Sequence, residues 1–198
     1  MSEGAEKSGK RPRRPRATRP IRGSQLHLDH RGRARMVDVG GKAVTARRAV
    51  ARGRVKLNTA AFRALSEGRL SKGDALAVAR LAGILAAKKT SEIVPLAHPI
   101  ALDAVVVDCV LEPKTQEVVV TATAATTART GVEMEVLTAA AGACLALYDM
   151  AKSLDRGIAI REIVLVEKTG GRSGAYRRER TADSAGRRAA RRPFPGNR

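Results

Sequence analysis

A long apolar segment, residues 130–152, carries ionisable side chains at both of its ends. Glu133 and Glu135 lie near its start, and Asp149 and Lys152 lie at its end. Because an unpaired charge is costly to bury, we expect these groups to face a partner or a ligand. Asp149 and Lys152 are three residues apart and share one helix face, where they form either a surface ion pair or an acid and a base beside a phosphate. Spacing alone leaves both interpretations open.

Two shorter motifs also contain residues that could do chemistry. In SKGD, Asp74 is typical of a helix start, since a carboxylate in the first turn complements the helix dipole. Lys72 precedes that helix and is better placed to meet a bound anion. His98 lies in PLAHP, in a rigid turn with little apolar sequence around it, which favours a functional role over a structural one.

The motif KTGGRSG, residues 168–174, combines three glycines with Lys168 and Arg172. Such a loop can offer backbone N–H groups and two cations to phosphates. It is not a Walker A motif, because the required spacing and the following helix are missing. By itself the loop does not identify a ligand.

The composition indicates one globular domain. The chain has 198 residues, of which 43% are hydrophobic, which is enough for a sizeable core. Aromatic residues make up only 2% and there is no Trp, so Ala, Val, Leu and Ile must build that core. The shortage of aromatics argues against RNA-binding modules that stack bases, although a basic nucleic-acid-binding module remains the alternative function.

The net charge of +19 is concentrated at the two ends of the chain. Residues 1–23 and 177–198 each carry +6, which leaves +7 for residues 24–176. Both ends lack hydrophobic periodicity, so we predict disordered basic tails at 1–23 and 183–198 around a domain at 24–182. The tails either bind anionic surfaces nonspecifically or select an anionic partner such as nucleic acid.

Cysteine usage and hydropathy predict a cytoplasmic protein that does not enter a membrane. Cys109 and Cys144 belong to no metal-binding or CxxC pattern, so we expect buried thiols in a reducing compartment. No targeting segment is visible, and the longest uncharged apolar run, residues 136–148, is too short to span a bilayer.

The elements that must position these residues alternate between strands and helices. The predicted strands are 36–39, 44–57, 101–111, 117–125 and 158–167. The predicted helices are 59–67 after an Asn58 cap, 73–89, and 130–155 with a Thr130–Glu133 capping box. This order predicts an α+β fold in which the helices pack on one face of a largely antiparallel sheet. The apolar stripe of the 73–89 helix is too wide for a surface helix, so we expect it to be covered on most sides.

Several motifs taken in order resemble the MoaC family, the cyclic pyranopterin monophosphate synthases of molybdenum cofactor biosynthesis. These motifs are MVDV, KGD, AAKKT, PLAHP, TGVEME, LTAAAGACLALYDMAK and KTGGRSG. The resemblance covers about residues 27–177. One departure is Ala97, where the family commonly has Cys before the histidine, which suggests that this thiol is not needed for chemistry.

The resemblance implies a ferredoxin-like fold and a hexamer built as a trimer of dimers, with active sites at subunit interfaces. The implied reaction converts (8S)-3',8-cyclo-7,8-dihydroguanosine 5'-triphosphate into cyclic pyranopterin monophosphate and diphosphate, which makes the enzyme a phosphorus–oxygen lyase. We expect no cofactor and no protein-bound metal, although a divalent cation such as Mg²⁺ could accompany the triphosphate.

The resemblance also implies roles for individual residues. Asp149 would be the acid/base residue, and Lys72 and Lys152 would be essential lysines. The predicted substrate-binding residues are Leu96, Ala97, His98, Met134, Glu135, Glu133, Lys168 and Arg47, and the resemblance implies that Lys168 lies near the phosphates. The negative charge of a triphosphate leads us to expect Arg47 or Arg172 there too.

Overall fold

The computed structural model describes residues 27–172 and 174–179, and the chain divides into two compact units, Met1–Val37 and Asp38–Arg198. The predicted tails at 1–23 and 183–198 lie outside the described residues. In the described part of the first unit, a turn is closed by a bridge between Leu28 and Ala34. The Asp29 carboxylate organises this turn by accepting the backbone N–H groups of Arg31 and Arg33 at 2.8 and 2.9 Å.

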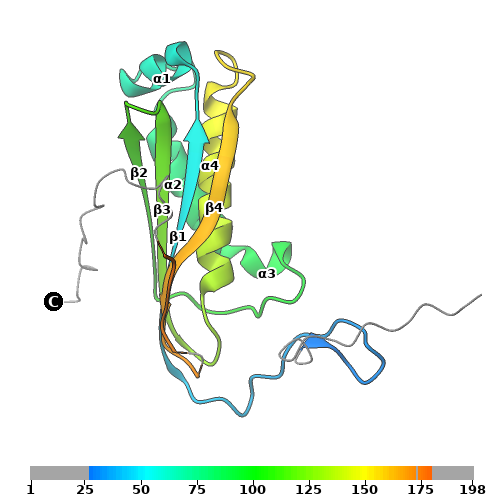
Figure 1. The fold of residues 1–198 in the computed structure, drawn as a ribbon. Helices are drawn as coiled ribbons and strands as arrows, with labels where there is room; N and C mark the ends of the chain where they lie inside the picture. Colours follow the sequence, from blue (N-terminus) through cyan, green and yellow to red (C-terminus); the bar gives the residue numbers. More distant parts are fainter. Residues whose placement is uncertain (1–26, 173, 180–198) are drawn as a thin grey trace, which may run out of the picture. The chain divides into compact units, whose positions relative to one another are not determined.

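The second unit contains one antiparallel sheet and two long helices (Figure 1). The strands are β1 (Thr45–Lys56), β2 (Ala104–Glu112), β3 (Glu117–Ala128), β4 (Ala159–Thr169) and β5 (Tyr176–Arg177), in the order β2-β3-β1-β4-β5. The helices are α1 (Thr59–Ser66), α2 (Ala75–Lys88), α3 (Thr90–Ile93) and α4 (Glu133–Ala151). The succession β1-α2-β2-β3-α4-β4, with β1 and β3 central, is the ferredoxin-like arrangement, so the predicted fold is confirmed.

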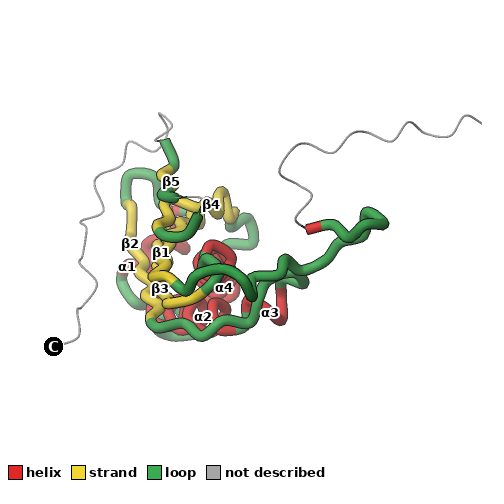
Figure 2. Tube along the Cα trace, turned by 90° about the horizontal axis from the view of Figure 1, so that it is seen from below, coloured by secondary structure: helices red, strands yellow, loops and turns green. Residues whose placement is uncertain are grey.

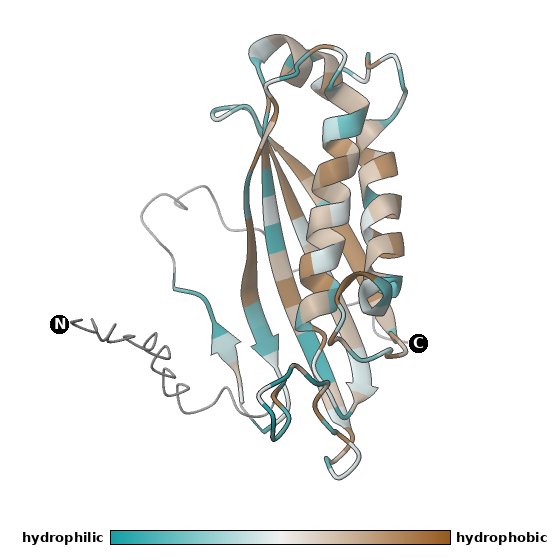
Figure 3. Ribbon diagram, turned by 90° about the vertical axis from the view of Figure 1, so that its right-hand side faces the viewer, coloured by the Kyte–Doolittle hydropathy of each residue, from teal (hydrophilic) through white to brown (hydrophobic). Residues whose placement is uncertain are grey.

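Helices α2 and α4 cover one face of the sheet as a single layer (Figures 2 and 3). The strand residues that point to them are small and fully buried, namely Ala49, Ala51, Val55, Val118, Val120, Ala122 and Ala124. Glycines let the two helices approach closely: a Cβ added at Gly142 would lie 2.6 Å from the Ala86 Cβ, and one at Gly83 would lie 2.9 Å from the Ala139 carbonyl oxygen. This close contact holds the start of α2 beside the end of α4.

Most of α2 is buried or half-buried, as predicted, but one side of the helix stays uncovered within one chain. Val78, Leu81 and Leu85 form a stripe along one side of the helix, and Leu81 and Leu85 are 64% and 57% exposed. Leu145 of α4 is 61% exposed as well. The physical reason is that the helices form only one layer, so each keeps an outer face that neither the sheet nor the other helix reaches.

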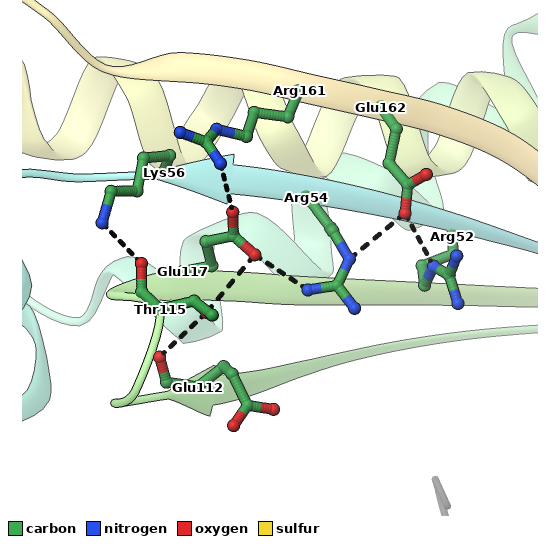
Figure 4. A network of polar contacts seen from close by, with 8 residues as sticks. All are labelled: Arg52, Arg54, Lys56, Glu112, Thr115, Glu117, Arg161 and Glu162. Carbon is green, nitrogen blue, oxygen red and sulfur yellow. Dashed lines mark hydrogen bonds and ion pairs between the residues drawn. The ribbon is translucent and has the colours of Figure 1, made fainter. Parts of the chain in front are cut away.

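The opposite face of the sheet carries a network of ion pairs (Figure 4). Glu117 is almost fully buried and is held by Arg54 at 2.8 Å and Arg161 at 3.3 Å. Glu162 accepts from Arg52 at 3.0 Å and from Arg54 at 3.2 Å. Arginines therefore compensate the carboxylates on this face, as burial of a charge requires.

The two edges of the sheet differ in length but both discourage pairing with another strand. The β2 edge carries the exposed Asp108 at its middle, and the Asp108 carboxylate accepts the backbone N–H of Cys109 at 2.9 Å. At the other edge, β5 has only two residues and pairs with Glu167 and Lys168, so most of β4, with its charged Arg161 and Glu162, forms this edge. Charges within an edge strand oppose edge-to-edge association.

Two helix starts agree with the sequence. The Asn58 side chain accepts the Ala61 N–H at 2.8 Å and caps α1. The Asp74 side chain accepts the N–H groups of Leu76 and Ala77 at 3.0 and 2.9 Å and caps α2. The structural interpretation of Asp74 is therefore confirmed.

The predicted capping box of α4 and the first predicted strand are wrong. Helix α4 follows Val132 and has no side-chain cap, because Glu133 folds back over Gly131 and its carboxylate fills the space that a Cβ there would need. Residues 36–39 belong to none of the strands, and Asp38 instead accepts the Gly40 N–H at 2.8 Å in the turn before β1.

Helix α4 also ends earlier than predicted, at Ala151. The Asp155 carboxylate, expected near the helix end, instead accepts the N–H groups of Asn58 and Gly157 at 2.7 and 2.8 Å and fixes the following turn. By length and composition α4 could cross a membrane, but this is weak evidence, because half of its most apolar window is buried inside the fold and core helices pass the same test.

Both cysteines are buried and unpaired, as predicted. Burial raises the pKa of the Cys109 thiol to about 11 and that of the Cys144 thiol to about 12. Thiols that stay protonated at neutral pH are poor nucleophiles, which agrees with a packing role.

Candidate active site

Lys72, Asp149 and Lys152, the three predicted catalytic residues, meet in one group, which we call the lysine–aspartate group. Lys72 Nζ donates to Asp149 Oδ2 at 2.7 Å and to the Asp149 carbonyl oxygen at 2.8 Å. Lys152 Nζ lies 2.8 Å from Asp149 Oδ1. The antiparallel packing of α2 on α4 produces this contact, because it places the turn before α2 beside the last turn of α4.

Electrostatics fixes the protonation of the lysine–aspartate group. The hydrogen bond from Lys152, and next that from Lys72, lowers the pKa of Asp149 to about 2. The Asp149 hydrogen bond in turn raises the pKa of Lys152. At neutral pH the carboxylate is ionised, and two cations flank one anion. All three side chains are substantially exposed, so the group can receive a ligand from solvent.

A second group of charged residues surrounds a cavity of about 660 Å³, which we call the cation cavity. It lies where β1 starts, β3 and β4 end and α4 begins. Its lining includes six cationic side chains, Lys42, Arg47, Arg48, Arg129, Lys168 and Arg172, and the carboxylate of Glu133. Such an excess of positive charge in a concave site suits a ligand with several phosphates.

The glycine loop positions Arg47 in the cation cavity. Gly170 and Gly171 have φ values of 89° and 79°, which favour glycine over residues that carry a Cβ. A Cβ at Gly171 would occupy the space of the Arg47 guanidinium. Arg47 Nε also donates to the Ala128 carbonyl oxygen at 3.4 Å. The predicted loop therefore takes part in the site through its backbone as well as through Lys168 and Arg172.

Glu133 and Lys168, both predicted to bind substrate, are paired inside the cation cavity. Lys168 Nζ lies 3.0 Å from Glu133 Oε1, and both side chains are partly buried. Sequence reasoning did not identify Lys42, Arg48 and Arg129. The available signals were the position of Arg129 directly before TGVEME and the cluster of cations around the start of β1.

The remaining predicted residues lie at the same end of α4 as the cation cavity but are not among its described lining residues. Glu135 is only 4% exposed, and burial, with a smaller contribution from the charge of Glu133, raises its pKa to about 7. Met134 is partly exposed beside it. The half-buried Leu96, Ala97 and His98 lie in the segment that joins α3 to β2.

The predicted site residues therefore form two groups at opposite ends of α4. Sixteen residues separate Glu133 from Asp149, which corresponds to about 24 Å along a helix. One subunit does not bring the two groups to the same nucleotide-sized ligand. Among the described residues, no three His, Cys, Asp or Glu side chains gather in a way that could hold a metal ion.

Comparison with known proteins assigns the sequence of this chain to a family. A sequence model described as the MoaC family matches residues 36–171, which include both groups apart from Arg172. The chain belongs to the MoaC family. The cyclic pyranopterin monophosphate synthase of Parvibaculum lavamentivorans is 53% identical over 151 residues, which cover 76% of this chain and 94% of that protein.

Two further MoaC relatives show the same extent of similarity. The cyclic pyranopterin monophosphate synthase of Thermomicrobium roseum is 55% identical over 153 residues, covering 77% of this chain and 92% of the relative. Cyclic pyranopterin monophosphate synthase 1 of Mycobacterium tuberculosis is 53% identical over 153 residues, covering 77% and 89%. The predicted family is confirmed, and the alternative of a nucleic-acid-binding module gains no support.

Proposed function

We propose that this chain catalyses the reaction after which its relatives are named, the formation of cyclic pyranopterin monophosphate. The substrate would be (8S)-3',8-cyclo-7,8-dihydroguanosine 5'-triphosphate, and the second product would be diphosphate. The main support is the similarity to named synthases over more than 90% of their length in two of the three cases described. The lysine–aspartate group and the cation cavity supply side chains suited to that chemistry.

The charges of the cation cavity fit the phosphate chemistry. Formation of a cyclic monophosphate from a triphosphate requires a substrate hydroxyl oxygen to attack the α-phosphorus while the bond to the β-phosphate oxygen breaks. Negative charge then accumulates on the departing diphosphate. Lys168, Arg47 and the neighbouring cations would stabilise that charge. Because diphosphate is eliminated as the phosphate ring closes, rather than displaced by water, the reaction is that of a phosphorus–oxygen lyase.

The lysine–aspartate group fits the proton transfers. Opening one ring of the substrate and closing a pterin ring requires a group that accepts and returns protons. With its pKa at about 2, Asp149 is a weak base while both lysines hold it. A phosphate that attracts Lys72 or Lys152 would release the carboxylate and raise its pKa, so substrate binding would itself activate Asp149. In this scheme His98, Leu96, Ala97, Met134 and Glu135 contact the purine-derived part of the substrate.

We infer that the complete active site lies between subunits of a cytoplasmic homohexamer, a trimer of dimers. The lysine–aspartate group and the cation cavity are about 24 Å apart within one chain, so a second subunit must bring one group to the other. The exposed stripe Val78, Leu81 and Leu85 and the exposed Leu145 supply apolar surface for such contacts. No cofactor is required by this scheme, although Mg²⁺ could accompany the triphosphate.

The decisive experiment is turnover of the cyclised dihydro-GTP by the purified chain. Diphosphate release and the fluorescent oxidised form of the pterin product would both be followed. We expect turnover by the full chain and by a version lacking residues 1–23 and 183–198, and none from Lys152→Ala. Lys114→Ala, an exposed lysine in the β2–β3 turn, is the matched control and should keep full activity. A folded oligomer without turnover would contradict the proposal.

A further inference from the structure

Among its described lining residues, the cation cavity has six cationic side chains, of which Arg48 is already paired with Glu167 outside the lining, and one carboxylate. That carboxylate belongs to Glu133, the first residue of α4, and it lies 3.0 Å from Lys168 Nζ. A carboxylate placed among phosphate-binding cations repels the phosphates that the cavity would receive. Its presence there requires an explanation other than attraction of the ligand.

The chain conformation around Glu133 favours this placement. Instead of entering a capping box, the side chain bends back over Gly131, and its carboxylate takes the space where any other residue would have a Cβ. Gly131 therefore makes room for the carboxylate inside the cavity. The same bend leaves α4 without a side-chain cap, so a capping hydrogen bond does not explain the conformation. A first-turn carboxylate complements the helix dipole in other side-chain conformations as well, so the dipole does not require this bend.

We propose that Glu133 is an internal counter-ion, whose carboxylate occupies the cation cavity when no phosphate is bound and must be displaced from Lys168 by an incoming di- or triphosphate. The inference rests on the proposed function for the identity of the ligand. It assigns Glu133 a regulatory role: the residue weakens retention of diphosphate and keeps Lys168 in place while the site is empty. A competing internal anion lowers the affinity for every phosphate ligand, product included.

The size of the effect follows from the charge removed. A like charge next to the bound phosphates opposes their binding, and it does so more strongly in a partly buried site than in water. Replacing Glu133 with Gln keeps the shape and removes the charge. We therefore expect Glu133→Gln to bind tripolyphosphate about tenfold more tightly than the wild type.

Isothermal titration of the full chain with sodium tripolyphosphate and with diphosphate, in metal-free buffer at fixed ionic strength, tests this inference. Gly131→Ala is the second variant, because its added Cβ would push the carboxylate away from Lys168 without changing the charge of the chain. We expect it to bind more tightly too. Glu67→Gln removes the same charge from a pair with Arg63, outside the cavity lining, and should match the wild type. Thermal unfolding shows whether each variant is folded. If Gly131→Ala does not fold, Glu133→Gln alone tests the inference.

The outcomes separate this inference from the proposed function. Unchanged or weaker tripolyphosphate binding by a folded Glu133→Gln would overturn the counter-ion proposal. Absence of binding by both the wild type and this variant would overturn it as well. Turnover by the wild type in the same preparation would leave the synthase proposal standing in those cases. If Glu133→Gln binds tripolyphosphate more tightly but the wild type shows no turnover, the counter-ion role stands and the synthase proposal is rejected.

Discussion

The two ends of α4 use a carboxylate in opposite ways. At the C-terminal end, Asp149 is exposed and two lysines hold it, so its pKa falls to about 2. At the N-terminal end, Glu135 is buried and lies near the charge of Glu133, so its pKa rises to about 7. One apolar helix thus carries a carboxylate that is ionised at neutral pH at one end and a carboxyl group that titrates near neutrality at the other. Contact with cations and burial, rather than residue type, decide what a carboxyl group can do.

The largest expected effect is the loss of turnover when a lysine of the lysine–aspartate group is removed, and it should exceed the loss of phosphate binding. Lys72→Ala and Lys152→Ala should each reduce turnover by about a thousandfold or more, because each removes a cation from Asp149 and from the departing diphosphate. Diphosphate release by the folded variants measures the loss. Tripolyphosphate affinity, measured on the same samples, should fall less than it does in Lys168→Ala. Wild-type rates in either lysine variant would contradict the proposed catalytic role.

The contact between α2 and α4 holds the lysine–aspartate group together, and Gly142 tests that contact. Gly142→Ala adds a Cβ only 2.6 Å from the Ala86 Cβ, and we expect it to lower the free energy of unfolding by about 1–3 kcal/mol through overpacking. Chemical denaturation measures the change. Gly41→Ala is the control, since a Cβ there meets nothing within 4 Å. Equal stability of the two variants would mean that the helices separate without cost.

At the other end of the sheet, Gly171→Ala should damage the cation cavity and leave the lysine–aspartate group intact. The new Cβ would displace the Arg47 guanidinium, and the positive φ of residue 171 disfavours alanine. We expect tripolyphosphate to bind about tenfold more weakly, as for loss of one phosphate contact. Gly68→Ala also changes a glycine with positive φ but lies outside the cavity lining, and it should bind tripolyphosphate normally.

The two carboxyl groups should give opposite pH dependences of stability. Glu135 has a higher pKa in the folded chain, about 7, than its ordinary value of 4.5, so the folded state retains a proton that the unfolded state has lost. Its contribution to the free energy of unfolding therefore falls as pH rises from 4.5 to about 7. In thermal melts, Glu135→Gln should lose less stability than the wild type between pH 5 and pH 8. A parallel loss in both proteins would show that Glu135 is not the titrating group.

Asp149 should act in the opposite sense and over a lower pH range. Its folded pKa of about 2 lies below the ordinary 3.8, so its stabilising contribution is complete above pH 3.8 and disappears as pH falls toward 2. The effect is the smallest of the series, because the side chain is exposed and solvent screens its ion pairs. Asp149→Asn should reduce the loss of unfolding free energy as pH falls from 3.8 toward 2. An unchanged loss would contradict this assignment.

Sequence reasoning found the lysine–aspartate group because its members lie at recognisable helix ends. Asp149 and Lys152 share a helix face by spacing alone, and Lys72 precedes a helix whose Asp74 cap is visible in the sequence. The contact of Lys72 with Asp149 required the antiparallel packing of two helices, which local patterns do not specify. The family resemblance supplied that step.

The cation cavity was only partly predictable. Its cations come from the β1 start, the β3 end and the loop after β4, which approach one another only once the sheet has formed. The capping box failed for a local reason, since Gly131 lets Glu133 fold back where a larger residue would have kept it out. The strand predicted at 36–39 failed because an extended segment needs a neighbour to pair with, and sequence alternation does not reveal whether one exists.

The charges at the edges of the sheet limit how copies of this chain can stack. Asp108 lies in the middle of β2, and Arg161 and Glu162 lie in the part of β4 that β5 leaves unpaired. Neither edge therefore offers a long uncharged template for another strand. These charged side chains thus oppose the growth of an Ala- and Val-rich chain into fibres.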